Sequence, residues 1–203
     1  MSIEIENEFR TLISKKDYQK LLRKFNSTIS LSKYSNMTNY YFDDKKYSLT
    51  KNDVVLRIRK YKEGDYQLTL KIPFGDSSQE VTQLLIPLEV KSIYKTGRLI
   101  EGEVNKFLHR YTRNKIKVIA ELKTMRKEYY FPDYIVVLDH SKYEGKEDYT
   151  LEIEGKNIHI AKTIFDEILK RHHIIYNNET ETKSKRAIIN KIGLEAYNDL
   201  FRI

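Results

Sequence analysis

The stretch Glu4-Ile5-Glu6-Asn7-Glu8-Phe9-Arg10 places a charged side chain at every second position. In an extended strand, successive side chains point to opposite faces, so one face carries the charges and the other the apolar groups. The charged face then holds Glu4, Glu6, Glu8 and Arg10. Alone, this pattern is typical of an edge strand with one face in water. It also fits a strand whose charged face lines an enclosed polar space that binds ions, and the rest of the chain distinguishes the two.

Length and composition limit the class of protein. The chain has 203 residues, enough for one substantial core, so residues 1–203 are expected to form a single domain. Lys and Arg number 37 against 29 Asp and Glu, and the resulting net charge of +8 favours an anionic partner. The absence of cysteine excludes a disulfide scaffold, a zinc–thiolate site and a cysteine nucleophile. The N-terminus lacks the features of a signal peptide and no apolar run approaches about 18 residues. We therefore expect a soluble, cytoplasmic protein with no membrane partner.

Helical and alternating patterns follow one another along the chain. Ser14-Lys15-Lys16-Asp17 has the form of a helix N-cap with an acidic residue three positions on. Further helical regions are expected at 89–111 and 158–171, and a last helix at 187–200 after a polar segment at 180–186. Strands are predicted at 39–42, 54–61, 66–72, 80–85, 116–130, 134–139 and 149–154, with a break at 73–76.

The polar phase of several predicted strands carries charges of both signs. Besides the opening stretch, these side chains are Arg57, Arg59, Lys71, Arg126, Asp139, Glu152 and Glu154. An ordinary wet face tends to carry Ser, Thr, Lys and Gln, so carboxylates at both ends of the chain with arginines between them indicate a polar interior. A closed antiparallel barrel provides such an interior, with its apolar outer face covered by helices. We therefore expect an α+β fold built on a barrel.

The residue types of this interior determine its chemistry. Clustered carboxylates repel one another unless a cation neutralises them, and hard divalent cations prefer oxygen ligands. Clustered Arg and Lys side chains need anions, and guanidinium groups bind phosphate in a bidentate manner. A site with both is complementary to a metal–polyphosphate complex. Phosphoryl transfer there requires a positioned metal, cationic stabilisation and an oriented nucleophile.

The segment Glu6-Asn7-Glu8-Phe9-Arg10 resembles the N-terminal ExExK signature of the CYTH superfamily, the triphosphate tunnel metalloenzymes. Class IV adenylate cyclases and thiamine triphosphatases are members. Further motifs follow in the family's order and approximate spacing, so the resemblance covers nearly the whole chain. They are Asn39-Tyr40-Tyr41-Phe42-Asp43, Leu56-Arg57-Ile58-Arg59, Leu68-Thr69-Leu70-Lys71, Glu80, Leu122 to Arg126, Leu138-Asp139, Glu152-Ile153-Glu154, and Lys183 with Arg186. The chain looks closest to the stand-alone bacterial CYTH proteins similar to thiamine triphosphatase.

This resemblance implies a closed, eight-stranded antiparallel barrel and Mg²⁺- or Mn²⁺-dependent hydrolysis of a triphosphate. The partner would be a small molecule such as inorganic triphosphate or thiamine triphosphate. The implied metal ligands are Glu6, Glu8, Asp139, Glu152 and Glu154. The implied catalytic residues are Glu6, Glu8, Arg57, Arg59, Lys71 and Arg126. The implied substrate-binding residues are Arg10, Arg57, Arg59, Lys71, Arg126, Lys183 and Arg186, and Glu80 is expected to position a basic side chain or a water molecule.

Two features depart from the family pattern. Arg10 stands where the signature has lysine, which keeps the charge but replaces a compact ammonium with a planar fork. Glu4 adds a carboxylate upstream, and we prefer the register Glu6–Arg10 because a register from Glu4 would put Glu8 where the basic residue belongs.

Other functions and other structural interpretations stay open at this point. An adenylate cyclase of the same superfamily needs an adenine pocket, which nothing in the sequence marks. A non-catalytic polyphosphate- or nucleotide-binding module is disfavoured, because clustered carboxylates would repel the anionic ligand unless a metal ion neutralised them. Nucleic-acid binding is disfavoured because no recognition motif is evident. Arg57, Arg59 and the Glu152/Glu154 pair could lie on an exposed strand, Asp139 could cap a turn, and Lys183 and Arg186 could belong to a solvated charge run. The oligomeric state is open, a homodimer included.

Overall fold

The protein, seen in a computed structural model, is described over residues 2–75, 77–177 and 181–202, without the side chains of residues 2 and 4–6. The described residues form eight strands, six α-helices and one 3₁₀-helix, and each strand pair given below is antiparallel. The α+β class is confirmed. The chain divides into two compact units: the first contains Met1–Ile5, Met37–Leu122 and Thr182–Ile203, and the second contains Glu6–Asn36 and Lys123–Glu181.

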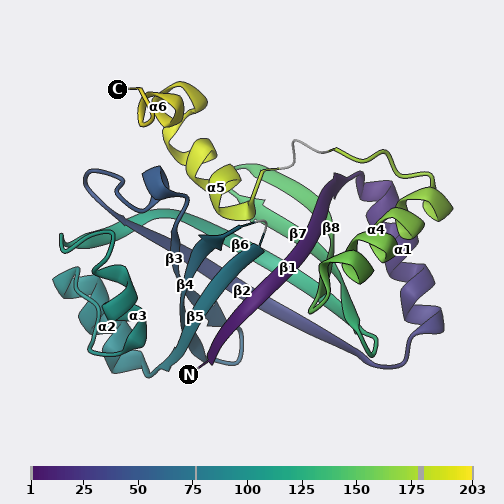
Figure 1. Ribbon diagram of the computed structural model, residues 1–203, viewed down its shortest axis with the longest axis horizontal. Helices are drawn as coiled ribbons and strands as arrows, with labels where there is room; N and C mark the ends of the chain where they lie inside the picture. The colour runs from purple at the N-terminus through teal and green to yellow at the C-terminus, as the bar shows by residue number, and fades with distance from the viewer. Residues whose placement is uncertain (1, 76, 178–180, 203) are drawn as a thin grey trace. The chain divides into compact units, whose positions relative to one another are not determined.

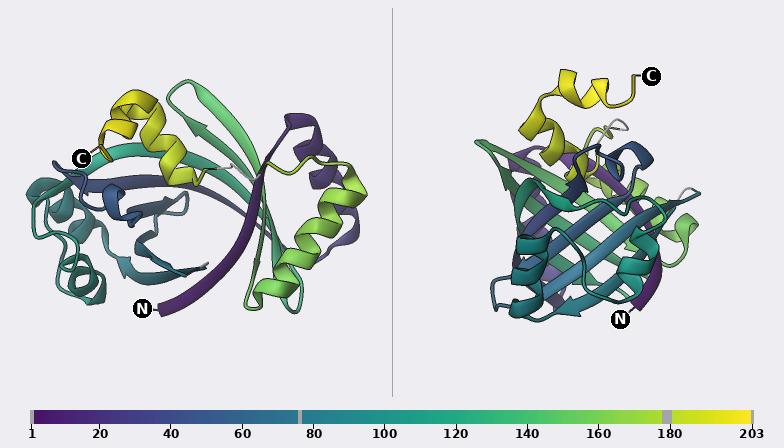
Figure 2. Two further views of the ribbon diagram at one scale, coloured as in Figure 1. Left: turned by 45° about the horizontal axis from the view of Figure 1, so that its top comes forward. Right: turned by 90° about the vertical axis from the view of Figure 1, so that its left-hand side faces the viewer.

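The first unit is built on strands in the order β5-β4-β3-β2. They are β2 (Ser32–Asp44, from Met37 onward), β3 (Val55–Tyr61), β4 (Tyr66–Phe74) and β5 (Ser77–Leu85). The helical elements of this unit are η1 (Thr50–Asn52), α2 (Pro87–Thr96), α3 (Glu103–Leu108), α5 (Lys183–Ile192) and α6 (Leu194–Asp199). The right-hand view in Figure 2 shows α2 and α3 beside these strands.

One face of the first unit's sheet is aliphatic and packs against α2 and α3. The core formed there includes Leu56, Ile58, Leu68 and Leu70 from the strands, Val90 and Ile93 from α2, and Val104 and Leu108 from α3. Full burial of each such side chain contributes about 1.5–3 kcal/mol relative to exposure. Because side chains alternate along a strand, the other face carries Arg57, Arg59, Gln67, Thr69 and Lys71.

The second unit has the strand order β6-β7-β8-β1. Its strands are β6 (Ile116–Tyr130, from Lys123 onward), β7 (Tyr134–Tyr143), β8 (Lys146–Gly155) and β1 (Ser2–Ile13, from Glu6 onward), and its helices are α1 (Lys15–Thr28) and α4 (Ile158–His172). Figure 1 shows α1 and α4 beside β7 and β8. Phe165 of α4 is fully buried and packs on Phe9 of β1 with ring centroids 6.0 Å apart. Phe9 therefore faces the helices, and its neighbours Glu8 and Arg10 point to the opposite, polar face.

Local sequence signals explain several element boundaries. The Ser14 hydroxyl accepts a hydrogen bond from the Asp17 backbone N–H at 3.0 Å, so the predicted N-cap of α1 is confirmed. Pro87 ends β5 and occupies the first turn of α2, where its missing N–H is tolerated. Gly193, with a φ of 88°, ends α5 and precedes α6.

Most predicted elements are confirmed, but the helical region predicted at 89–111 is two short helices, α2 and α3, and several other bounds need correction. β2 and β7 are longer than the predicted strands 39–42 and 134–139, because strand pairing continues where the alternation of polarity fades. The break predicted at 73–76 begins later, since Pro73 still pairs with Ser78 in the β4–β5 ladder. The last helix does not run over 187–200: α5 begins at Lys183, because the Thr182 hydroxyl caps it by accepting from the Lys185 N–H at 3.2 Å.

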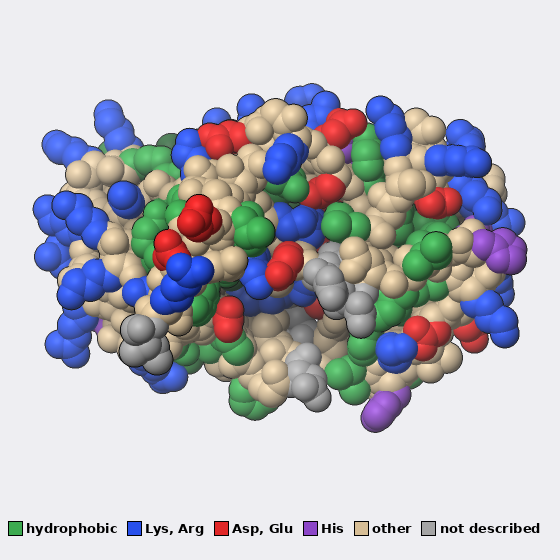
Figure 3. All heavy atoms as spheres, turned by 90° about the horizontal axis from the view of Figure 1, so that it is seen from above, with side chains coloured by type: hydrophobic (Ala, Val, Ile, Leu, Met, Phe, Trp, Pro, Cys, Tyr) green, Lys and Arg blue, Asp and Glu red, His purple; other side chains and the backbone are tan. Residues whose placement is uncertain are grey.

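Lys and Arg side chains are spread widely over the surface in view in Figure 3, with fewer Asp and Glu side chains between them. Among the described residues, no helix combines the length and the apolar character needed to cross a bilayer.

Candidate functional site

Three carboxylates of β1 and β8 meet on the polar face of the second unit. Glu8 pairs directly with Glu154 in the β1–β8 ladder, and Glu152 lies two residues from Glu154 on the same face. Each of the three offers an oxygen atom, and these oxygens all lie within 4.8 Å of one another. Glu152 is only 2% exposed. Such a group of hard oxygen donors suits a divalent cation such as Mg²⁺ or Mn²⁺.

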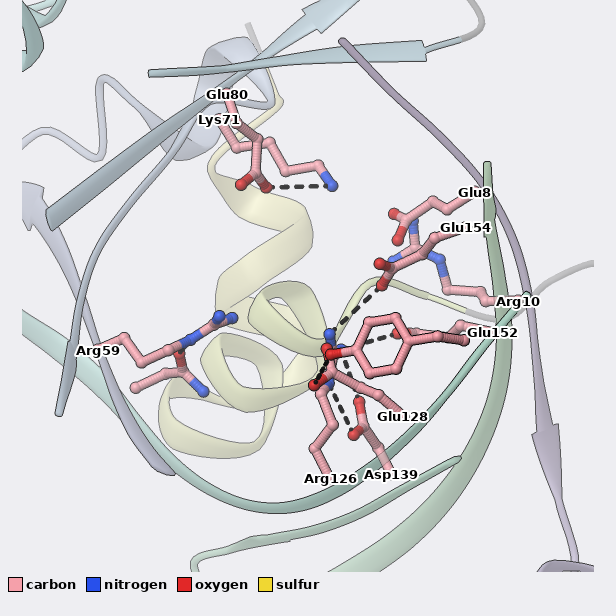
Figure 4. A network of polar contacts seen from close by, with 12 residues as sticks. Glu8, Arg10, Arg59, Lys71, Glu80, Arg126, Glu128, Asp139, Glu152 and Glu154 are labelled. Atoms are coloured by element: carbon pink, nitrogen blue, oxygen red, sulfur yellow. Dashed lines mark hydrogen bonds and ion pairs between the residues drawn. The ribbon is translucent and has the colours of Figure 1, made fainter. Parts of the chain in front are cut away.

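Arg126 of β6 binds the same carboxylates (Figure 4). Its guanidinium forms two hydrogen bonds with Asp139, from Nε at 3.0 Å and from Nη2 at 2.9 Å. It also donates to Glu152 at 3.0 Å and to Glu154 at 3.3 Å. Burial alone would lower the pKa of Arg126, but Asp139, Glu154 and Glu152 outweigh it and hold the pKa well above its ordinary value. Arg126 therefore acts as an internal counter-ion within the carboxylate cluster.

Asp139 lies in the middle of β7 and is fully buried. The alternative that it caps a turn is wrong, because it pairs with Arg126 on one side and with Thr150 on the other. Its side chain orients the Arg126 fork by a bidentate contact. Whether it also supplies a metal ligand stays a prediction.

Arg10 faces the cluster from β1. It forms an ion pair with Glu8 and lies directly opposite Glu152 in the β1–β8 ladder. The second unit thus collects Glu8, Arg10, Arg126, Asp139, Glu152 and Glu154 from four strands on one polar face. The side chain of Glu6, a predicted ligand, lies outside the described residues.

The polar face of the first unit carries the predicted basic side chains of β3 and β4. Glu80 of β5 lies between them, 3.5 Å from Arg57 and 3.4 Å from Lys71 (Figure 4 shows the Lys71 contact). Burial alone would raise the pKa of Glu80, but the charges of Arg57, Lys71 and Arg59 outweigh it and lower the pKa below its ordinary value. Glu80 therefore stays ionised and positions two basic side chains. Positioning a basic side chain is one of the two roles that the sequence analysis expects for it.

Arg59 is held by uncharged groups that the sequence analysis did not identify. Its Nε donates to the side-chain oxygen (Oδ1) of Asn39 at 3.0 Å, and its Nη1 donates to the Tyr61 hydroxyl at 3.4 Å. The Tyr61 hydroxyl in turn donates to Gln67 at 3.2 Å. Asn39 and Gln67 lie directly opposite Arg59 on the two neighbouring strands, so knowledge of the register would have revealed them. Arg57 and Arg59 are both partly buried, so the exposed-strand alternative is wrong for them.

Lys183 and Arg186 lie on the first two turns of α5 and are both partly buried. Their spacing of three residues puts them on neighbouring positions of one helix face. They belong to an ordered helix of the first unit rather than to a solvated charge run. Their contact with phosphate stays a prediction.

Comparison with known proteins identifies the family. The CYTH domain model matches residues 4–188. A Bacillus subtilis (strain 168) protein named "Putative triphosphatase YjbK" is 32% identical over 189 residues, which cover 91% of this chain and 94% of that protein. A crystal structure of a "putative adenylate cyclase" from Bacillus halodurans is 33% identical, with a TM-score of 0.83 over 92% of this chain and 98% of that one. A Hippeastrum protein described as having a dominant triphosphatase activity is 22% identical, with a TM-score of 0.76 over 93% and 97% of the two chains, and shares the fold. The chain belongs to the CYTH domain family.

Proposed function

We propose that this protein is a divalent-metal-dependent triphosphatase that hydrolyses inorganic triphosphate or a small organic triphosphate such as thiamine triphosphate. The observation that carries the proposal is the group of three carboxylates whose oxygens lie within 4.8 Å of one another, with two guanidinium groups bound to it. The name of the Bacillus subtilis relative supports the same reaction class. A cytoplasmic location stays a prediction of the sequence.

Glu8, Glu152 and Glu154 would hold the metal, together with Glu6 and Asp139. Four described carboxylates face two guanidinium groups on this sheet, which leaves an excess of negative charge that suits a divalent cation. Mg²⁺ or Mn²⁺ bound there would polarise a phosphoryl oxygen or lower the pKa of a bound water.

The substrate phosphates would bind Arg57, Arg59 and Lys71, with Arg10, Arg126, Lys183 and Arg186 as further cationic contacts. Glu80 holds Arg57 and Lys71 at 3.5 and 3.4 Å, and Asn39 holds Arg59, so these cations are preorganised. Preorganised charge stabilises the transition state of phosphoryl transfer without reorganisation during the reaction.

Both sets of residues would act on one substrate if the sheet closes into an eight-stranded barrel, and we include this closure in the proposal. Each unit has one apolar, helix-covered face and one polar face. Strands β1, β2 and β6 each contribute residues to both units. Residues 1–203 would then form a single domain with the two polar faces lining a tunnel.

Phosphate release from a triphosphate panel, with Mg²⁺, with Mn²⁺ and with EDTA, tests the proposal. We expect metal-dependent turnover that falls at least about a hundredfold in Glu152→Gln and Arg57→Met, since each loses a charged contact to the reacting complex. Glu147→Gln is the matched control because Glu147 lies on β8 but is 42% exposed and pairs with His140. Undiminished turnover in Glu152→Gln and Arg57→Met would overturn the assignment.

A cyclase is distinguished by its products. Incubation with ATP and Mn²⁺ followed by chromatography separates cyclic AMP with pyrophosphate from ADP with phosphate. We expect the hydrolytic products, and formation of cyclic AMP as the main product would replace the proposed activity.

A further inference from the structure

Three buried hydroxyl groups lie beside the carboxylate cluster on the polar face of the second unit. They belong to Thr124, Ser141 and Thr150, which are 3%, 0% and 0% exposed. Among the described residues, none donates to or accepts from their Oγ atoms. A buried hydroxyl without a partner destabilises the folded state, and three on one face are unusual in a native structure.

Strand register brings these hydroxyls together. Thr124 lies directly opposite Ser141 in the β6–β7 ladder, and Thr150 lies directly opposite Asp139 in the β7–β8 ladder. Ser141 and Asp139 are two residues apart on β7, so their side chains share a face. Side chains directly opposite each other have Cβ atoms about 4.5–5.5 Å apart. A water molecule with two hydrogen bonds of about 2.8 Å each spans such a gap.

We propose that Thr124, Ser141 and Thr150 form an internal hydration site with more than one ordered water molecule, one of which bridges Thr150 and Asp139. A buried water needs two to four polar partners, and the three hydroxyls supply both donors and acceptors. Thr150 lies directly opposite Asp139, so a water molecule bound to the Thr150 hydroxyl is within reach of the Asp139 carboxylate.

The hydration site would fix Asp139 from the side opposite Arg126. Asp139 sets the orientation of the guanidinium, which contacts Glu152 and Glu154. Thr124, Ser141 and Thr150 are thus positioning residues for the metal-binding carboxylates. The effect on metal affinity rests on the proposed function, whereas the hydration site itself does not.

Isosteric substitution distinguishes a hydrated site from a dry one by the sign of its effect. Thermal unfolding is measured in EDTA for Thr124→Val and Thr150→Val. If water fills the site, each variant loses hydrogen bonds and the midpoint falls by about 2–4 °C. If the site is dry, each variant removes a hydroxyl without a partner and the midpoint rises, which would overturn the proposal. Because hydrolysis is not measured, failure here is separate from failure of the proposed activity.

Mn²⁺ titration followed by electron paramagnetic resonance tests the link to the carboxylates. We expect Thr150→Val to bind Mn²⁺ about 10–100-fold more weakly than wild type, as for other residues that orient metal ligands. Thr11→Val is the matched control: its buried hydroxyl accepts from the Asn177 N–H at 3.0 Å on the other face of the sheet. This control should unfold at a lower temperature but bind Mn²⁺ as wild type does. Wild-type affinity in Thr150→Val would overturn the positioning role, and a crystal structure with no water beside Thr150 and Asp139 would overturn the site.

Discussion

Replacement of Arg126 by methionine tests the role of the internal counter-ion. Methionine fills similar space without charge, so the variant leaves three carboxylates without their shared guanidinium. The side chains of Asp139 and Glu152 are 0% and 2% exposed, and that of Glu154 is 20% exposed. Removal of one partner from a buried ion pair destabilises a protein by about 3–5 kcal/mol. For a chain of this size each kcal/mol shifts the unfolding midpoint by about 2–4 °C, so we expect a fall of about 6–20 °C in EDTA.

Divalent metal should restore much of this loss, because the ion neutralises the same oxygen atoms. At a hundredfold excess over its dissociation constant, a ligand stabilises the folded state by about 2.7 kcal/mol. The ion no longer competes with the Arg126 guanidinium in Arg126→Met, so a given Mn²⁺ concentration should raise the midpoint more in the variant than in wild type. Thermal unfolding followed by circular dichroism, with EDTA and with increasing Mn²⁺, gives both values for each protein.

Two further variants make the result interpretable. Arg126→Lys keeps the charge but loses the fork, and should unfold between wild type and Arg126→Met. Lys162→Met removes an exposed ion pair to Asp166 in the same unit and should shift the midpoint little. An unchanged midpoint of Arg126→Met in EDTA, or the same Mn²⁺-dependent rise in variant and wild type, would refute the counter-ion role.

Three other predictions follow from the described contacts. Because the pKa of Glu80 is lowered, its contribution to stability is present above its ordinary pKa and is lost as the pH falls through the lowered value. The difference in unfolding free energy between wild type and Glu80→Gln should therefore become smaller as the pH is lowered from about 7 to about 3, a range that brackets the titration of carboxylates. A difference that does not change with pH would contradict this prediction. Phe165→Ala empties a fully buried position on α4 and should lower the urea unfolding free energy by about 3–5 kcal/mol; a loss below that of a surface substitution would contradict the packing. Ser14→Ala removes the N-cap of α1 and should lower thermal stability by about 0.5–2 kcal/mol, whereas Ser14→Asp should retain most of it.

Alternation of polarity was sufficient to predict which side chains share a polar face. Arg57 with Arg59, and Glu152 with Glu154, lie on the faces that their spacing predicts. The strand predicted at 116–130 has the least regular separation of polar and apolar residues, yet β6 has the predicted bounds. Its residues still alternate over a long stretch, which is typical of a strand, although each face mixes polar and apolar side chains.

Contacts that depend on register could not be predicted in the same way. Asn39 supports Arg59 only because the β2–β3 ladder sets them opposite each other, and a single strand carries no information about its partner. The hydroxyls of Thr124 and Thr150 gave no signal because uncharged polar residues are ordinary on a wet strand face. The start of α5 was missed because its first turn is polar and is fixed by the Thr182 cap rather than by an apolar stripe.

The contacts of Arg126 have a consequence for how the protein matures in the cell. A domain whose acidic residues depend on an external ion for neutralisation can complete folding only after it has met that ion, as in many small metalloproteins. Here the first cation is encoded in the chain and reaches the carboxylates as β6 pairs with β7. The cluster can therefore assemble during synthesis in a metal-poor environment and bind the proposed metal ion afterwards.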